Sequence, residues 1–505
     1  MPELSRGRRL LVLAVCCSSL FIVGLDATIV NIALPSIQHD LHAPVSGLQW
    51  TVDAYTLVVA SFLILAGSTG DRIGRRRTFQ VGLATFTLGS LLCSLAPSLG
   101  WLVAFRAVQA IGGSMLNPVA LSIISNTFTD DRERARAFGI WGAVFGLSMA
   151  LGPVLGGVLV ATVGWRGIFW VNIPVGIAAI VATALAVPES RAAHGRRVDP
   201  VGQLLIIVML ASLTYAIIEG PRHGWGSGLI LGLFGLAALA TAGLAVYEPR
   251  RAEPLLDLRF FRSAPFTGAV LIAISAFSAL AGFLFLNTLY LQDARHLSAL
   301  HAGLYTLPMA AMTVLLAPLS GRITGQRGPR IPLLVAGVMT TAGGLMMAGV
   351  TAATPVAWLL LGYFAFGIGN GMVNPAISNT ALSGMPRAQA GVAAAVASTS
   401  RQVGGSLGVA LTGSAVASAL HGPLRTGFVP ASHGAWLITA GCGVLVLVAG
   451  LATSGRWARE TAARTAGRLM SEKPGIPSPP PDPPRRLDPP RRDHDFGGAV
   501  TPPKS

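Results

Sequence analysis

The residues best suited to chemistry are ionisable side chains inside long apolar stretches. Asp26 lies in VGLDATIVNIALP (23–35), Asp53 lies just inside the next apolar stretch, and Arg106 lies in the stretch that begins at Trp101. Burial favours the protonated form of a carboxyl group and a nearby arginine favours the ionised form, so Asp26 can exchange a proton. All nine histidines lie outside these stretches. We therefore predict a carboxylate as proton carrier, with Asp26 first and Asp53 as its rival. The partner of Asp26 must come from another helix, and Arg106 is the candidate for adjusting the pKa of Asp26.

A purely structural role for Asp26 is the alternative, because buried polar groups often serve packing alone. Its carboxyl group would then hydrogen-bond backbone or Asn31 at a helix interface. We favour a proton-carrying role because no other acidic residue lies as deep inside an apolar stretch.

The stretch from Trp101 carries a polar face. Arg106, Gln109, Gly113 and Asn117 are spaced i, i+3, i+7 and i+11, which places them on one side of a helix. A charge at the centre of a membrane helix costs roughly 2.5–3.5 kcal/mol, so such residues are usually functional. Arg106 lies near the start of its stretch, and its guanidinium could instead reach the membrane surface. We predict a functional role.

A glycine- and arginine-rich segment, GSTGDRIGRRR (67–77), follows the second apolar stretch. Its glycines permit a tight turn, and Asp71 is suited to a helix N-terminus or to an arginine across an interface. Anchoring by positive charge would explain the arginines but not the spacing of the glycines and the aspartate. We predict that the segment biases a conformational change through Gly67, Asp71, Arg72, Gly74, Arg75 and Arg76.

The fifth apolar stretch contains GAVFGLSMALGPVLGG (142–157). Its small residues predict a smooth helix face, and Pro153 is expected to bend the helix. Ordinary close packing of helices is the alternative, and packing is part of the explanation in either case. The face consists of Gly142, Gly146, Ala150, Pro153 and Gly157.

Several other chemistries are excluded by context. The segment GGSLG (404–408) fits the hydrolase pattern G-x-S-x-G, but that pattern requires a preceding strand and here it lies in an apolar helix. The phosphate-binding loop is absent, since neither Lys473 nor Lys504 follows a glycine. The four cysteines are not at metal-ligand spacing. We predict no enzyme activity, no metal and no cofactor, with the proton as coupling ion.

The composition indicates that lipid is the solvent for most of the chain. Of 505 residues, 52% are hydrophobic and 11% are charged, whereas soluble domains carry about 25% charged residues. The net charge of +16 would suit nucleic acid, but the basic residues occur in short clusters between apolar stretches, which excludes that partner.

Fourteen stretches approach the length of about 20 residues that a membrane-spanning helix needs. They are 10–35, 48–67, 79–96, 101–124, 137–162, 167–188, 200–219, 228–247, 266–291, 302–320, 331–351, 355–378, 392–418 and 434–453.

The basic residues are distributed unequally between the two ends of these helices. The N-terminal segment and the even-numbered loops hold 21, whereas the alternate loops hold four, namely Arg166, Arg222, Arg295 and Arg425. Positively charged loops stay in the cytoplasm, so we predict a cytoplasmic-membrane protein with both termini inside. The tail from about Arg456 is rich in Pro and Arg, and we predict that it is disordered and can touch anionic lipid.

Two parts of the chain repeat. WLVAFRAVQAIGGSMLNPVA from Trp101 aligns with WLLLGYFAFGIGNGMVNPAI from Trp358, so that Asn117 falls on Asn374. GSTGDRIGRRR aligns with GRITGQRGPR (321–330), in which Gly325 occupies the position of Asp71. Repeated helical halves around a midplane site are the architecture of secondary transporters.

We therefore predict an all-α integral membrane fold with two pseudo-symmetric six-helix halves. The predicted parts are an N-terminus (1–9), a first half (10–188), a cytoplasmic link with two inserted helices (189–262), a second half (263–455) and a disordered tail (456–505).

These motifs together resemble the major facilitator superfamily, and within it the fourteen-span drug/proton antiporter branch. LDATIVNIALP (25–35) resembles the first-helix signature of that branch, and GSTGDRIGRRR resembles the superfamily's loop motif, with Gly70 in place of the usual Ala. GWRGIFWVNIPVG (164–176) is also similar to the branch, and the resemblance covers about residues 10–455. The fourth-helix motif corresponds to Arg106, Gln109, Gly112 and Gly113, and the fifth-helix antiporter motif to Gly146, Gly152, Pro153, Gly156 and Gly157.

The resemblance implies a major facilitator fold, alternating access, a part for Arg106 in proton transfer, and substrates that are often hydrophobic or cationic. On this basis we predict proton-coupled efflux of drugs, antibiotics or natural products by a monomer. A dedicated exporter of one endogenous metabolite, a membrane sensor without transport, and a membrane enzyme are the alternatives. A sensor should carry a folded soluble domain and an enzyme should carry a polar cluster at a membrane face, and the sequence shows neither.

Overall fold

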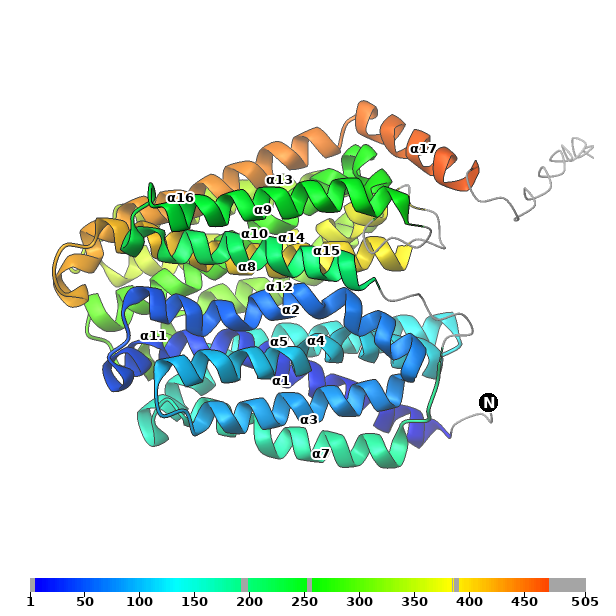
Figure 1. Ribbon diagram of the computed structural model, residues 1–505, viewed down its shortest axis with the longest axis horizontal. Coiled ribbons are helices and arrows are strands. Elements are labelled where there is room, and N and C mark those ends of the chain that lie inside the picture. The colour runs from blue at the N-terminus through cyan, green and yellow to red at the C-terminus, as the bar shows by residue number, and fades with distance from the viewer. Residues whose placement is uncertain (1–4, 192–198, 252–256, 384, 386–389, 472–505) are drawn as a thin grey trace, which may run out of the picture.

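The structure is a computed structural model that describes residues 5–191, 199–251, 257–383, 385 and 390–471. Its described residues form a bundle of long helices lying roughly parallel to one another (Figure 1). The first group comprises α1 (Arg6–Leu41), α2 (Val45–Ile73), α3 (Arg75–Ser94), α4 (Leu99–Thr127), α5 (Asp131–Val163), α6 (Gly167–Trp170) and α7 (Asn172–Ala186).

A second group follows two intervening helices. The intervening helices are α8 (Pro200–His223) and α9 (Gly228–Tyr247), with the short helices η1 (Glu248–Arg250) and η2 (Leu258–Arg262) after them. The second group comprises α10 (Ala264–Leu289), η3 (Tyr290–Ala294), α11 (Ala299–Tyr305), α12 (Leu307–Arg327), α13 (Arg330–Ala348), α14 (Val356–Leu382), α15 (Ala390–Ala419) and α16 (Leu424–Thr453), and α17 (Arg456–Ser471) follows it.

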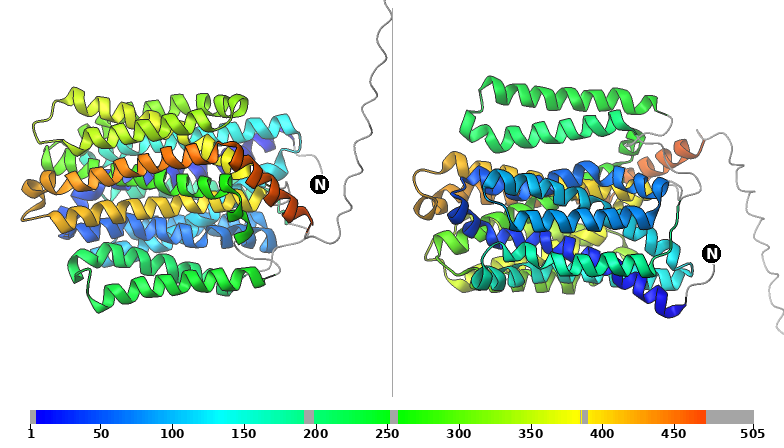
Figure 2. Two further views of the ribbon diagram at one scale, coloured as in Figure 1. Left: turned by 90° about the horizontal axis from the view of Figure 1, so that it is seen from above. Right: turned by 60° about the horizontal axis from the view of Figure 1, so that its bottom comes forward.

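Helices α1 to α7 pack mainly on one another, as do α10 to α16, so the bundle has two halves. The halves meet along two seams, where α2 packs on α15 and α5 packs on α11 and α12. Helices α8 and α9 form an outlying pair beside the bundle (Figure 2). Helix α8 contacts both α2 and α15, so the pair covers the outside of the first seam.

Eleven helical segments among the described residues are long and apolar enough to cross a membrane, and a twelfth is α2, which bends by 52° between Val45–Leu63 and Leu65–Ile73. Helices α3 and α15, which correspond to two further predicted spans, fall outside this count. Helix α3 begins with three arginines, and α15 carries Arg401 among many Ser, Thr and Gly residues. Both pack on neighbouring helices of the bundle, and the figure of fourteen spans stays a prediction.

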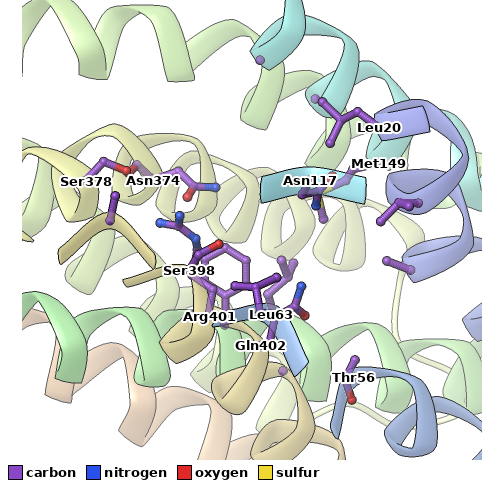
Figure 3. Close-up of a pocket in the computed structure, with 18 of the residues that line it drawn as sticks. Leu20, Thr56, Leu63, Asn117, Met149, Asn374, Ser378, Ser398, Arg401 and Gln402 are labelled. Carbon is purple, nitrogen blue, oxygen red and sulfur yellow. The ribbon is translucent and has the colours of Figure 1, made fainter. Parts of the chain in front are cut away.

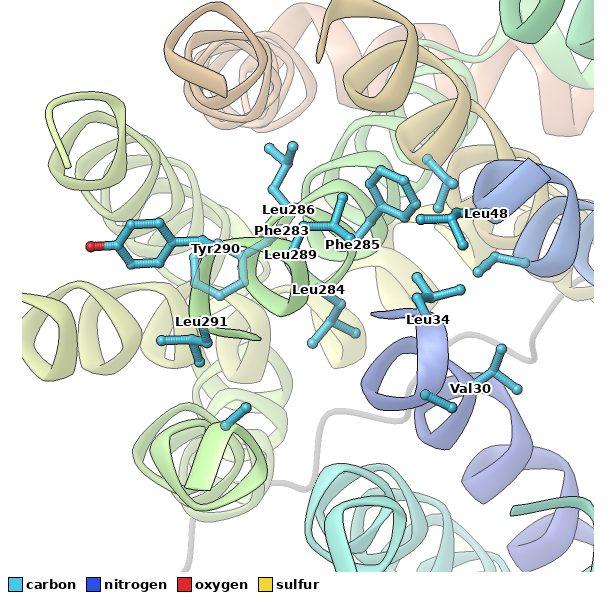
Figure 4. Close-up of a cluster of buried hydrophobic side chains, with 14 of the residues drawn as sticks. Val30, Leu34, Leu48, Phe283, Leu284, Phe285, Leu286, Leu289, Tyr290 and Leu291 are labelled. Atoms are coloured by element: carbon cyan, nitrogen blue, oxygen red, sulfur yellow. The ribbon is translucent and has the colours of Figure 1, made fainter. Parts of the chain in front are cut away.

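An apolar cluster joins the two halves near one end of the bundle. It contains Val30 and Leu34 of α1, Leu48 of α2, and Phe283 and Leu291 from α10 and η3 (Figure 4). These side chains are buried against one another, and van der Waals packing of this kind holds membrane helices together. The cluster lies at the end opposite the start of α1, because α1 begins at Arg6 and reaches Leu34 more than twenty residues later.

The prediction of disorder from residue 456 is wrong for its first sixteen residues, which form α17. Ala458, Ala462 and Thr465 are buried, and Thr461 Oγ1 accepts a hydrogen bond of 3.1 Å from Ala264 N at the start of α10. Spacing of three and four residues gives α17 one small, apolar face that packs on the bundle, a pattern that the overall Pro and Arg content conceals. The rest of the predicted tail lies outside the described residues.

Candidate functional site

A cavity of about 1520 Å³ lies between the two halves. The first half contributes residues of α1, α2, α4 and α5 to its wall, and the second half contributes residues of α10, α12, α14 and α15. Most of the lining residues are apolar or glycine. Asn117 of α4 and Asn374 of α14, which the internal repeat makes equivalent, both line the cavity (Figure 3).

The cavity reaches the end of the bundle at which α1 begins. Its wall there includes Asp71 at the end of α2, Phe138 in α5, and Phe260 in η2. At the opposite end the halves are in contact: Gln292 Nε2 donates to Ile32 O at 2.8 Å, and Gln49 Nε2 donates to Ala410 O at 2.9 Å. The cavity is therefore accessible from one end of the bundle and closed at the other.

Beside the cavity, Asp26 and Arg106 form a buried ion pair. Arg106 Nη1 donates to Asp26 Oδ2 at 2.6 Å, and the two residues are 1% and 0% exposed, respectively. Arg106 Nε also donates to the carbonyl oxygen of Thr51 at 3.2 Å. The guanidinium lies 4.4 Å from the centre of the Tyr55 ring, an arrangement that further stabilises a cation in apolar surroundings. Arg106 therefore does not extend to the membrane surface.

Three neutral polar side chains complete the network around Asp26. Gln109 Nε2 donates to Asp26 Oδ1 at 2.9 Å, and Asn172 Nδ2 lies 3.4 Å from the same oxygen. Ser90 Oγ accepts hydrogen bonds from both amides, at 3.3 and 3.0 Å. These residues come from α1, α3, α4 and α7, all in the first half. The structural alternative for Asp26 is wrong in its choice of partners, because Asn31 Nδ2 donates to Ala27 O instead.

Two glycines of the fourth-helix motif allow this network to form. A Cβ on Gly113 would lie 2.6 Å from the hydroxyl oxygen of Tyr55, so a larger residue would displace the ring that stacks on Arg106. A Cβ on Gly112 would collide with the backbone of Phe86 in α3. Small residues at these positions let helices approach closely, which brings Ser90 within reach of Gln109.

Asp53 lies outside this network. It is fully buried in α2, and Thr56 Oγ1 donates to its Oδ1 at 3.3 Å. Ser406 of α15, in the other half, lies close enough to interact with this carboxyl group. Gln49 and Asp53 are four residues apart, and Gln49 bonds to α15, so Asp53 faces the seam between the halves. Neither Asp26 nor Asp53 is part of the described cavity wall.

The loop motif fixes the turn between α2 and α3 onto the end of α7. Asp71 Oδ1 accepts a hydrogen bond of 2.9 Å from Arg75 Nη2, so the predicted arginine across an interface is wrong and the partner lies within the motif. Gly74 has φ of +126°, and a Cβ there would lie 2.5 Å from Glu189 Oε1. Arg76 N donates to the same oxygen at 3.1 Å. Asp71 and Gly67 also line the cavity, whereas Arg72 is exposed.

The fifth-helix motif packs on both halves at the closed end. Gly152 and Gly156 lie against Thr28 and Ile29 of α1, in the same half. Gly157 lies against α11 of the other half, where a Cβ would be 2.7 Å from Ala299 O and from Leu300 Cα. Pro153 and Gly146 line the cavity. The motif thus forms part of the contact that closes one end.

The sequence interpretation missed Arg401, Asn172 and Ser90. Arg401 lies in α15 and lines the cavity, and the rule that singled out Arg106, an ionisable residue inside an apolar stretch, applies to it equally. Asn172 lies in GWRGIFWVNIPVG (164–176), which carries part of the family resemblance without a role for this residue. Ser90 carries no such signal, because single small polar residues are common in membrane helices.

Known proteins provide an independent comparison. Residues 16–409 match the model of the Major Facilitator Superfamily. The chain is 37% identical to the multidrug resistance protein Stp of Mycobacterium tuberculosis, over 83% of this chain and 78% of that protein. It is 38% identical to the tetracenomycin C resistance and export protein of Streptomyces glaucescens, over 82% and 77%. It is 36% identical to the methylenomycin A resistance protein of Streptomyces coelicolor, over 77% and 82%.

Among solved structures, a bacterial homologue of the human lysosomal transporter Spinster superposes with a TM-score of 0.64 at 16% identity, over 92% of this chain and 98% of that one. This similarity shows that the two chains share a fold. With a family match over most of its length, relatives above 30% identity and a bundle of apolar helices, the chain belongs to the Major Facilitator Superfamily and is a multi-pass membrane transporter.

Proposed function

We propose that the protein exports small amphipathic molecules across the cytoplasmic membrane in exchange for protons, by alternating access. The observation that carries the proposal is the cavity between the halves, which is accessible at one end and closed at the other. Its volume of about 1520 Å³ exceeds the 300–1,000 Å³ typical of small-molecule sites, which suits substrates of varied shape. The named resistance and export functions of its relatives support export rather than import.

Alternating access requires the closed end to open. The contacts that must separate are specific: Gly157 on α11, Gln292 on α1, and Gln49 on α15. The apolar cluster that joins the halves at this end must separate with them. All of these contacts lie between helices and not within one, so two rigid halves can part without unfolding a helix. The arginine-rich loops lie at the accessible end, and the positive-inside rule makes this the cytoplasmic side. The structure then corresponds to a state that loads substrate from the cytoplasm.

Proton coupling is assigned to the buried carboxylates. Protonation of Asp26 would remove the charge that Arg106 pairs with, and so alter the packing of α1 against α4. Asp53 is buried at the moving seam beside Ser406 of α15, which makes it the second candidate. One proton that crosses 100 mV releases about 2.3 kcal/mol, enough for a roughly 50-fold gradient of a neutral substrate.

The test is uptake into proteoliposomes that contain the purified protein. An imposed pH gradient should drive accumulation of a fluorescent amphipathic dye, and a proton ionophore should abolish the accumulation. Dye movement that never exceeds equilibration would refute coupled export.

Membrane orientation is tested separately. Reporter fusions after Arg197 and at the C-terminus should report cytoplasm, and fusions near His42 or Gly427 should report the outside. Termini on opposite sides would refute the assignment of the cavity mouth to the cytoplasm.

A further inference from the structure

Arg401 is a charged residue of the cavity wall that the proposed transport mechanism does not use. It lies well inside α15 and shares one wall of the cavity with Asn374, Ser378 and Ser398 (Figure 3). Within the described part of the chain, Arg401 forms no hydrogen bond or ion pair, and its Nη1 is buried without a partner. A guanidinium group at membrane depth is costly unless something pairs with it.

The acidic residues of the described cavity wall do not supply that pair. The described wall contains three acidic residues, all near the ends of helices, and each has an arginine close by. The pairs are Asp71 with Arg75 at 2.9 Å, Asp199 with Arg251 at 3.8 Å and Asp257 with Arg259 at 2.8 Å. The buried Asp26 is held by Arg106, and Asp53 is not part of the wall. The deep part of the cavity therefore carries an uncompensated positive charge.

We propose that Arg401 binds the acidic group of the substrate, which is an amphipathic organic anion with a carboxylate or an ionised acidic hydroxyl. The inference rests on the proposed export function. A guanidinium group donates two parallel N–H bonds to a carboxylate, which a neutral side chain cannot do. Asn374 and Ser398 offer further donors on the same wall, and Phe277, Leu280 and Leu284 offer apolar surface for the body of the molecule.

This assignment reverses the expectation of cationic substrates. A cation in the cavity would meet an unpaired like charge in surroundings of low dielectric constant, where repulsion is strong. An anion instead supplies the partner that the fold lacks. When one monoanion leaves and one proton enters, two net positive charges move inward, so the membrane potential drives the exchange. Exchange of a monocation for a proton moves no net charge.

Binding to the purified full chain in detergent tests the proposal without requiring transport. The probes are fluorescein, an anionic dye, and rhodamine 6G, a cationic dye with the same ring system, and fluorescence anisotropy measures each affinity. The variants are Arg401→Gln, Arg401→Lys and, as a control, Arg222→Gln, which removes an exposed arginine outside the cavity. Size-exclusion profiles verify that each variant is folded.

Wild-type protein should prefer fluorescein. Arg401→Gln should weaken fluorescein binding about tenfold or more, the loss expected when a charge-assisted hydrogen-bonded pair is removed, and should leave rhodamine 6G binding unchanged or stronger. Arg401→Lys should keep part of the preference, and Arg222→Gln all of it. If Arg401→Gln does not fold, the wild-type preference and the Arg401→Lys result still decide. A wild type that prefers the cation or binds neither dye, or an unchanged ratio in Arg401→Gln, overturns the proposal.

The two proposals fail separately. If fluorescein binds through Arg401 but no gradient drives its movement, coupled export is refuted and the anion site stands. If export is driven by protons but Arg401→Gln changes neither dye, export stands and the role of Arg401 is refuted. Fluorescein uptake should also increase with a potassium diffusion potential that is positive on the receiving side, and no increase would contradict exchange of an anion for a proton.

Discussion

In the described part of the chain, two arginines lie well inside membrane-spanning helices, and their surroundings differ completely. Arg106 in the first half is paired with Asp26 at 2.6 Å and also bonds to Gln109 and to the backbone of Thr51. Arg401 in the second half faces the cavity and has no partner in the described residues. The arginine of the first half is thus paired within the protein, whereas the arginine of the second half faces the cavity without a partner among the described residues.

This difference suggests separate roles for the two halves in the proposed transport cycle. The network around Asp26 is built from helices of one half only, so it can respond to a proton without waiting for the halves to move. In the anion-binding proposal, Arg401 gains its partner from the ligand that enters the cavity. In our two proposals, the first half carries the coupling ion and the second half binds the charge of the substrate.

Among the variants that test this comparison, Asp26→Asn is expected to have the largest effect. It should abolish transport driven by a pH gradient and destabilise the protein by about 3–5 kcal/mol, because Arg106 is left buried without its counter-charge. Asp26→Glu should retain some transport. Proteoliposome uptake and thermal unfolding in detergent measure the two effects.

The matched control is Asp40→Asn on the same helix. Asp40 is paired with Arg166 at 2.7 Å, but its side chain is 48% exposed, so its loss should cost at most about 1 kcal/mol. Uphill export with normal proton flux in Asp26→Asn would make Asp26 structural, and Asp53→Asn would then be the next variant to measure.

The double variant Asp26→Asn/Arg106→Gln sharpens the comparison further. Removal of both charges should recover much of the stability that Asp26→Asn loses, since no buried charge is left unpaired. Transport should stay absent, because no group remains to carry the proton. Thermal unfolding of both single variants and of the double variant completes the double-mutant cycle. Full recovery of transport in the double variant would show that the pair serves packing alone.

A smaller effect is expected from Gly157→Ala, which tests the contact between the halves. The new Cβ would lie 2.7 Å from backbone atoms of Ala299 and Leu300, and overpacking of this kind costs about 1–3 kcal/mol. The closed end should be destabilised and transport slowed. Gly142→Ala on the same helix is the control, because a Cβ there meets nothing within 4 Å. Equal thermal stability and uptake in the two variants would contradict the assigned contact.

The smallest effect on stability is expected from Asp71→Asn. Asp71 is partly exposed and pairs with Arg75 four residues on, so its loss should cost at most about 1 kcal/mol. Membrane insertion should be normal and transport slower, because the turn between α2 and α3 is held less firmly against α7. The control is Arg72→Gln at the exposed neighbouring position. Wild-type transport rates in Asp71→Asn would mean that the motif only anchors the loop.

The sequence alone predicted an all-helical membrane bundle of this superfamily, because apolar stretches, arginine-rich loops and short motifs are local signals that survive without coordinates. It also selected Asp26, Arg106 and Gln109, since an ionisable or amide side chain in an apolar helix is conspicuous wherever it points. It did not anticipate α17, whose small buried residues are hidden in a basic, Pro-rich tail.

Only the tertiary structure decided which polar groups meet. Asp26 and Arg106 are 80 residues apart, and the sequence made Arg106 only a candidate partner. The structure shows that the two pair, and that Asn172 and Ser90 join them. The separation of the two arginines into a paired group and an open one depends on which helix face turns toward a neighbour and which toward the cavity. Helix periodicity shows which residues share a face, but the packing of fourteen predicted spans decides what each face meets.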